Sequence, residues 1–431
     1  MWFLTLFAAE EIPAAMVTYL ALLMLLQLGC SPAVSTLLSA LLFVPWVLKP
    51  FLRAWTRRVG HYRRMLHLAE LLMGLSLLAV AFAFRHGRLH VFCALMLVSL
   101  LCAWHELTAH LYYERMLRPV FQRLLTRPRM VCSQMAVIFT YGVLIFLVGT
   151  LQVYFRQVRY SWSLGCYVAA GIFLLFALHH LIWLRTPSAA PKASMASASS
   201  AAPDAFMVSA ASADLQTGTS PDALASRRRT AWQGVWLLAL LLLPQGLLFH
   251  ARVLYLYLAH AQGGLQCTMQ EIGFAQGTVG VIAFSVGIAL GLWLTDHLPW
   301  HRLFWPMAVV LMLSPAVYLV MTIVPPHSLW PLCCGTMSAQ LFFGLGLCIC
   351  LHPISIIFGT RHRSAIGMFR IPLVAAVMIL PMALSGWMVE MLGFHIYFLT
   401  ATLLAPCCLL AVRLLRYDKR LIGHPANSPR C

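Results

Sequence analysis

Charged residues are scarce in this sequence, and acidic residues are the scarcest. Only 10% of its 431 residues are charged, with 30 Lys and Arg against 12 Asp and Glu, while 61% are hydrophobic. A soluble domain carries about 25% charged residues. The composition therefore excludes a soluble protein. Apolar runs also recur from one end of the chain to the other, which excludes a single membrane anchor.

The sequence also lacks the motifs of several other classes. Its 13 cysteines lie almost wholly inside apolar runs and form no Cys-x-x-Cys pair, so we expect no disulfide framework and no cysteine metal site. No glycine-rich phosphate loop is present, which disfavours an ATP-driven pump. In the segment HELTAH the histidines are five residues apart, about 140° around a helix, which does not fit the zinc hydrolase motif.

Long apolar runs dominate what is present. A spanning helix needs about 20 apolar residues, and backbone polar groups in hydrocarbon must be paired internally, which leaves helix bundles or closed barrels. Runs such as LALLMLLQL are continuously apolar, whereas barrel strands alternate. The sequence therefore predicts an all-α polytopic membrane protein. Its twelve apolar segments are 3–28, 31–51, 65–84, 89–113, 131–154, 161–184, 231–258, 272–294, 303–324, 330–358, 364–388 and 394–415.

The composition changes between the sixth and seventh segments. Residues 186–230 are rich in Ala, Ser and Pro and end in three arginines, which is typical of a flexible, solvated linker. We therefore expect four parts: an N-terminal six-helix bundle at 1–185, the linker at 186–230, a C-terminal six-helix bundle at 231–415 and a tail at 416–431.

The basic residues between segments predict the orientation. The connections after segments two and four carry eleven Lys and Arg, against four in the connections after segments three and five. The positive-inside rule then places both termini and the linker in the cytoplasm, in a multi-pass protein of the inner (cytoplasmic) membrane. Anionic lipids account for the net charge of +18, so we expect membrane lipids as partners and no nucleic acid.

A weak repeat relates the two halves. Segment two is followed by RRVGHYRR, in which Arg57, Arg58, Gly60 and Arg63 form a basic turn, and segment eight by DHLPWHR, which contains Asp296 and Arg302. We interpret both turns as gating loops. Duplicated halves around a midplane cavity are typical of secondary transporters.

Three stretches resemble a known family. FAAEEIP at 7–13 is similar to F-x-x-G-L-P, LFVPWVLKPF at 42–51 to L-P-W-x-x-K, and CAWHELTAHLY at 102–112 to S-A-T-Q-D-I-A-x-D-A-Y. Through these stretches the chain resembles the major facilitator superfamily and, within it, the muropeptide permease branch. Here Arg57 replaces the family's loop aspartate, and Glu106 and His110 replace two aspartates of the fourth span.

The resemblance implies the major facilitator fold, with twelve transmembrane helices in two six-helix bundles. It implies a secondary transporter of a polar organic solute, coupled to protons and active as a monomer. Cell-wall muropeptides or related amino-sugar compounds are the solutes that it suggests. No cofactor is expected beyond the coupling proton.

Ionisable residues inside spans are costly to bury, so each is a candidate functional residue. The densest set lies at the end of the fourth segment, where Glu106, His110 and Glu114 are spaced i, i+4, i+8 on one helix face with Tyr113 beside them. A carboxylate four residues from an imidazole shares a proton with it readily. This spacing predicts a proton relay or a clamp on a polar substrate; the alternative is a structural hydrogen-bond network.

Further candidates lie on three other segments. Glu10 and Glu11 are about 12–15 Å into the first span and about 100° apart around it, so one of them is expected to face a cavity. Gln245 and Arg252 share a face of the seventh segment, and Arg370 lies near the start of the eleventh. An arginine in a cavity binds anions; snorkelling to the membrane surface is the alternative for both arginines.

Five tryptophans fall near predicted span ends: Trp46, Trp55, Trp162, Trp300 and Trp330. We interpret them as an interfacial aromatic belt. Three functions remain in competition: a transporter, which we favour over any enzyme; a polytopic membrane enzyme that uses Glu106 and His110; and a non-transporting sensor or assembly protein derived from a transporter.

The predicted topology is testable with reporter fusions. Because the positive-inside rule fixes the orientation, fusions at Arg88 and Ser161 should report a periplasmic location, and a fusion at Arg127 a cytoplasmic one. The opposite pattern would contradict the topology.

Overall fold

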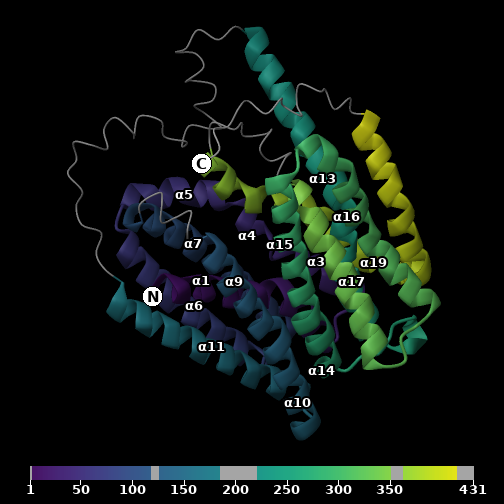
Figure 1. The fold of residues 1–431 in the computed structure, drawn as a ribbon. Helices are drawn as coiled ribbons and strands as arrows, with labels where there is room; N and C mark the ends of the chain where they lie inside the picture. The colour runs from purple at the N-terminus through teal and green to yellow at the C-terminus, as the bar shows by residue number, and fades with distance from the viewer. Residues whose placement is uncertain (1, 118–125, 185–220, 351–362, 415–431) are drawn as a thin grey trace.

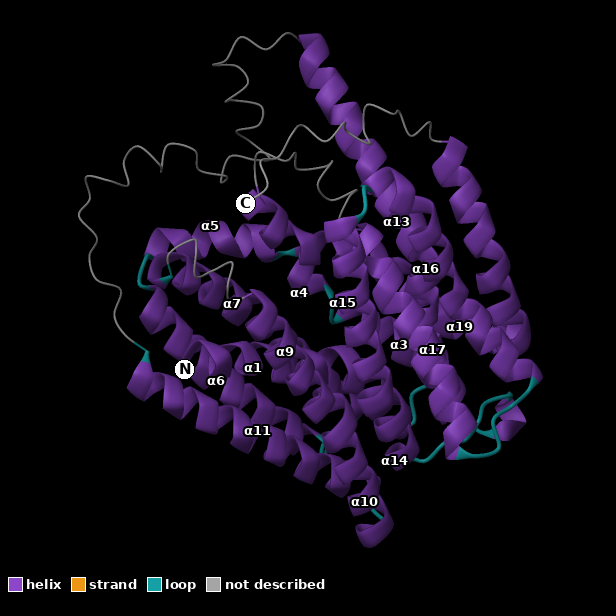
Figure 2. Ribbon diagram, in the orientation of Figure 1, coloured by secondary structure: helices purple, strands orange, loops and turns teal. Residues whose placement is uncertain are grey.

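The structure is a helical bundle throughout its described residues. This computed structural model describes residues 2–117, 126–184, 221–350 and 363–414, and every regular element within these ranges is a helix (Figure 1, Figure 2). Helices satisfy their own backbone hydrogen bonds, which suits a chain whose outer faces meet lipid. Large apolar side chains such as Leu75, Leu175 and Val320 are more than half exposed on these outer faces.

The N-terminal half forms from the first six predicted segments. The first segment is α1 (Trp2–Ala15), the π-helical η1 (Met16–Leu20) and α2 (Ala21–Gln27). Then follow α3 (Pro32–Leu41), α4 (Val44–Val47), α5 (Lys49–Val59), α6 (Tyr62–Ala83) and α7 (Arg88–Met116). The half ends with α9 (Thr126–Val137), the π-helical η2 (Ile138–Leu144), α10 (Ile145–Phe155) and α11 (Val158–Trp183).

The C-terminal half repeats this pattern. It starts with α13 (Pro221–Tyr257) and the short η4 (His260–Gln262). Next come α14 (Met269–Ile272), the π-helical η5 (Gly273–Gly280) and α15 (Val281–His297). α16 (Trp300–Ile323), α17 (Leu329–Leu347), η6 (Cys348–Cys350) and α19 (Arg363–Leu414) complete it. Figure 1 shows the two halves side by side, purple to blue and teal to yellow.

The described helices are compatible with twelve spans. Ten are long and apolar enough to cross a membrane, and the bent pair Pro32–Val47 and Lys49–Val59 would add an eleventh. The ten include a 40-residue stretch of α19, and α19 covers both the eleventh and the twelfth predicted segments. It is interrupted at Gly393, whose φ of 73° lies in the left-handed region that favours glycine.

Some predicted boundaries differ from the observed ones. α13 begins at Pro221, so ten residues assigned to the linker, 221–230, are helical. The rest of that linker, residues 351–358 of the tenth segment and the tail at 416–431 lie outside the described residues.

The second span ends earlier than its sequence predicts. The chain bends by 41° after α4 and continues as α5, which carries basic residues in its last turn and ends at the left-handed Gly60. Two residues counted as loop cations, Lys49 and Arg53, are buried in this bend, 5% and 7% exposed. We call the membrane end that carries α5 the basic end and the other the far end.

Small residues bring the two halves together. η2 of one half packs against η5 of the other, where a Cβ on Gly277 would overlap the carbonyl of Tyr141. Toward the far end, α3 packs along α19, and the Gly386 N–H donates to Thr36 Oγ1 at 3.2 Å. Nearer the basic end, Ser285 Oγ donates to Gln134 Oε1 at 3.1 Å. In Figure 1 the halves converge toward α10 and α14 and diverge toward α5.

We expect Gly277→Ala to weaken the contact between the halves, because the added methyl group meets backbone and not a flexible side chain. The melting temperature of the purified protein should fall, and a cysteine at position 278 should become more reactive. Gly171→Ala is the matched control, since Gly171 lies in α11 with open space around it and alanine favours helix there. Equal melting temperatures for the two variants would contradict the close contact.

Candidate functional site

The first charged pair of the N-terminal half joins α1 to α9. Glu10 is 7% exposed, and its Oε2 lies 3.1 Å from Nη2 of Arg129. The arginine side chain is 37% exposed, so the pair is reachable from one side. Glu11, one residue on, is half-buried and is engaged by Ser133. Of the two predicted glutamates, Glu10 is therefore the buried one that pairs with a cation.

A second pair joins α7 to the bend between α4 and α5. Glu106 Oε2 forms an ion pair with Lys49 Nζ and accepts a hydrogen bond of 3.2 Å from Trp46 Nε1. The Glu106 side chain keeps 21% exposure, whereas Lys49 is almost fully buried. Lys49 therefore acts as an internal counter-ion and not as the loop cation that the sequence indicated.

Glu106 and His110, predicted to form a relay, each pair with another residue in the structure. His110 Nε2 lies 3.3 Å from Glu114 Oε1, and Glu106 is taken by Lys49. Both side chains of the His110–Glu114 pair are about one-third exposed near the basic end. Tyr113 packs its ring on Phe7 of α1, 4.9 Å between centroids. The predicted stripe is thus divided between two ion pairs, because a cation from another helix reaches Glu106.

The sequence analysis missed a third acidic cluster. Glu70 of α6 is 1% exposed, and its Oε1 lies 2.5 Å from Nδ1 of His180 on α11 and 3.6 Å from Nε2 of His105 on α7. His67 Nδ1 lies 3.6 Å from the other carboxylate oxygen, and His180 Nε2 is 3.0 Å from Thr5 Oγ1 on α1. The signal was available, since Glu70 and His180 are ionisable residues inside apolar runs.

Two tryptophans assigned to the interfacial belt are instead internal. Trp46 is 6% exposed and donates to Glu106, and Trp162 is fully buried and donates to Gln27 Oε1 at 2.5 Å. Trp55 and Trp330 are 54% and 81% exposed, as a belt requires. The side chain of Trp300 lies outside the described residues.

In the C-terminal half, α13 directs its polar residues in two directions. Gln245 Nε2 donates to the carbonyl of Leu311 at 2.5 Å, and Tyr255 Oη donates to that of Met321 at 2.7 Å, so both hold α16. Arg252, 6% exposed, stacks its guanidinium on Phe249, 5.0 Å from the ring centroid. Arg370 lies in α19, and its side chain is outside the described residues.

Solved transporters share this architecture. A bacterial homologue of the human lysosomal transporter Spinster, in an inward-facing and occupied conformation, has a TM-score of 0.70 at 12% identity, over 99% of this chain and 98% of that chain. The nucleoside transporter NupG has 0.64 at 14%, over 97% and 98%. A D-xylose–proton symporter has 0.64 at 12%, over 96% and 95%. The chain has the major facilitator fold. No protein-family model and no curated protein sequence matches it.

Within the major facilitator fold, the predicted gating residues lie at the basic end. Arg57 is half-buried and Arg58 exposed in the last turn of α5, Gly60 ends that helix, and the half-buried Arg63 begins α6. Their counterparts, Asp296 in the last turn of α15 and Arg302 in the first turn of α16, are both exposed. Their role in gating stays a prediction.

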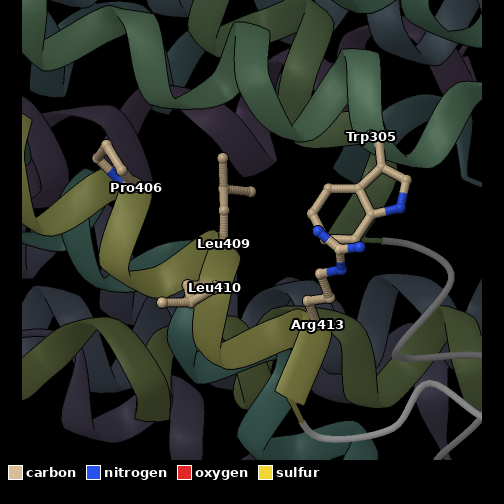
Figure 3. A pocket seen from close by; sticks show the side chains of 5 residues that line it. All are labelled: Trp305, Pro406, Leu409, Leu410 and Arg413. Carbon is tan, nitrogen blue, oxygen red and sulfur yellow. The ribbon is translucent and has the colours of Figure 1, made fainter.

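A pocket of about 490 Å³ lies between α16 and α19. Trp305 of α16 and Pro406, Leu409, Leu410 and Arg413 of α19 line it (Figure 3). Leu410 and Trp305 are 58% and 41% exposed, so the pocket is a groove on the outer surface of the C-terminal half. In the part of the chain that the structure describes, no three His, Cys, Asp or Glu side chains are arranged to hold a metal ion.

The Lys49–Glu106 pair is expected to contribute to the stability of the fold. Lys49→Met leaves a largely buried carboxylate without its cation and should lower the free energy of unfolding by about 3–5 kcal/mol. The double variant with Glu106→Gln should recover part of that loss, because both charges are then gone. Unfolding of the four purified proteins in detergent measures the coupling. Arg64→Met, an exposed cation nearby, is the control. Additive losses from the two substitutions would contradict the pair.

Proposed function

We propose that this protein is a secondary transporter that couples the movement of a polar organic solute to the movement of protons. The observation that carries the proposal is the presence of two carboxylate–cation pairs, Glu10–Arg129 and Glu106–Lys49, inside one half of a major facilitator fold. Carboxylates are costly inside a membrane unless they are paired. Such groups are the sites where a proton exchanges most readily for another partner.

The two pairs act on helices that also touch the other half. Arg129 belongs to α9, which continues into η2 and so reaches η5. Lys49 follows α4, and α4 packs on α19. A proton on Glu10 or Glu106 removes the negative charge and releases the cation from its partner. The helices that join the halves are then free to take another arrangement, which is the link between proton binding and a change of state that coupling requires.

The identity of the solute is proposed from the sequence resemblance, and the positions of the paired residues within the matched stretches support this choice. Cell-wall muropeptides or related amino-sugar compounds are the proposed solutes. Glu10 and Glu106, with Trp46 and Lys49, belong to the three stretches that resemble muropeptide permeases. We propose further that the protein acts as a monomer in the inner membrane with both termini in the cytoplasm, with Glu10, Glu11, Glu106, His110 and Tyr113 among the solute- or proton-binding residues.

The proposal is tested by uptake into proteoliposomes of labelled anhydro-muropeptides, with and without an imposed pH gradient. We expect an acidic exterior to stimulate uptake several-fold. Glu106→Gln and Glu10→Gln should abolish the stimulation, because an amide keeps the shape of the carboxylate but does not titrate.

Glu271→Gln is the matched control for these substitutions. Glu271 caps α14 through hydrogen bonds to the Thr268 N–H and hydroxyl, and glutamine keeps such a cap. The pH dependence should therefore survive in this variant. Uptake that ignores the gradient, or that stays gradient-driven in both Glu106→Gln and Glu10→Gln, would contradict proton coupling through these pairs.

A further inference from the structure

Arg252 is a buried cation without an acidic partner among the described residues. It is 6% exposed, its Nε has no hydrogen-bond acceptor, and its guanidinium lies on the ring of Phe249. The buried Lys49, by contrast, is neutralised by Glu106, and Arg129 by Glu10. An ionised side chain removed from water costs several kcal/mol unless it is paired. Arg252 is therefore a residue whose surroundings require an anion.

Other groups around Arg252 suit the same anion. Ring contacts lead from Arg252 to two phenol groups: its guanidinium lies on Phe249, Phe249 lies beside Tyr19 of η1, and Tyr19 stacks on Tyr141 of η2. Tyr141 is 1% exposed, and its hydroxyl has no partner. Two unsatisfied donors, a guanidinium N–H and a phenol O–H, thus lie in the same region.

Aromatic rings surround these donors. Tyr19 and Tyr141 stack with centroids 4.7 Å apart, Phe249 lies 6.0 Å from Tyr19, and Phe43 of the second span lies 6.1 Å from Phe249. Tyr19, Tyr141 and Phe43 belong to the N-terminal half, whereas Phe249 and Arg252 belong to the C-terminal half. The site is consequently completed only where the two halves meet, as a transported solute requires.

Resting on the proposed function, we propose that the solute presents one carboxylate group to this site, where Arg252 and the Tyr141 hydroxyl bind it, with an apolar or ring face of the solute against Tyr19 and Phe249. Guanidinium groups bind planar carboxylates through two parallel N–H donors. This substrate class is narrower than a polar organic solute. It is inferred from Arg252 and Phe249 of the C-terminal half, whereas proton coupling is proposed for residues of the N-terminal half.

The charge balance at Arg252 selects a bound group with one negative charge. One guanidinium neutralises one negative charge, so a phosphate monoester would leave a net charge of about −1 in a site of low dielectric constant. The carboxylate of Glu11 does not serve as the counter-ion, because it lies two helical turns before Tyr19 and is engaged by Ser133. A neutral sugar or nucleoside would leave Arg252 without a counter-ion, and an ammonium group would add a second positive charge.

The test compares matched probes on the purified full chain. N-acetylmuramic acid and N-acetylglucosamine share the amino-sugar ring, but only the first has a carboxylate, and benzoate and benzyl alcohol form a second such pair. N-acetylglucosamine 6-phosphate is the dianionic probe. Binding is measured in detergent as the shift in melting temperature with ligand concentration. We expect at least one carboxylate to bind at least tenfold more tightly than both its neutral partner and the phosphate.

The variants separate charge from structure. Arg252→Gln should weaken carboxylate binding by about tenfold to a hundredfold, the value of one or two charged hydrogen bonds, while Arg252→Lys should retain part of it. Tyr141→Phe should weaken binding by less, because the ring stack survives. Arg159→Gln, an exposed cation at the far end, is the control and should bind as the wild type does. Melting temperatures without ligand show whether each variant is folded.

Two results would overturn the proposal: no carboxylate binds the wild type better than its neutral partner, or Arg252→Gln binds carboxylates as tightly as Arg252→Lys and the wild type. Transport failure is a separate outcome. Carboxylate binding that depends on Arg252, without uptake into proteoliposomes, would overturn the transporter and leave the anion site standing. Uptake of neutral sugars that is unaffected by Arg252→Gln would overturn the anion site and leave the transporter standing.

Discussion

The structure depends on one constraint: a charge inside the membrane must find a partner there. Glu10, Glu70 and Glu106 are carboxylates within the spans of the N-terminal half, and each is met by a cation or an imidazole from another helix. α1 is thereby tied to α9, α6 to α11, and α7 to the bend after α4. The partners lie 119, 110 and 57 residues apart in the chain. These pairs therefore connect helices that are far apart in the chain, and they are the groups that we propose a proton rearranges.

Both halves are helical, but they differ in chemistry. Inside its spans the N-terminal half contains acidic residues with cationic partners. In the C-terminal half the acidic residues Glu271, Asp296 and Glu390 lie at helix ends, and its interior holds Arg252 and neutral hydrogen-bonding side chains such as Gln276. This asymmetry favours a division of roles, with protons handled in the first half and the solute's charge in the second.

The contact between the halves rests on backbone proximity rather than on charge. Glycines at 142, 277 and 386 allow helices from the two halves to approach closely, and two of the three π-helical segments meet there. π-helical turns widen the helix and often occur at functional sites. A contact built from small residues can separate and reform without leaving charges unpaired, as alternation between two states requires.

Sequence patterns predicted the helical membrane fold and the order of its apolar segments, because twenty-residue apolar runs leave little choice in hydrocarbon. The candidate site was predicted only in part. Glu10 and Glu106 were recognised because a carboxylate in an apolar run is conspicuous, but their partners were not. Lys49 was read as a loop cation, since the sequence does not show the 41° bend that turns it inward. Trp46 and Trp162 were assigned to the interfacial belt because they lie near predicted span ends, and that position in the sequence does not reveal which side chains surround them.

By itself, then, the sequence determined that this is a helical membrane protein with a duplicated architecture and a few costly buried charges, because hydropathy and charge are properties of each residue. Only the tertiary structure decided which charges neutralise one another and which remain without a partner. Pairing depends on helices brought together across 57 to 119 residues of chain, and no local pattern encodes that contact. It is the tertiary structure that gives Glu106 and His110 different partners and leaves Arg252 buried on the ring of Phe249.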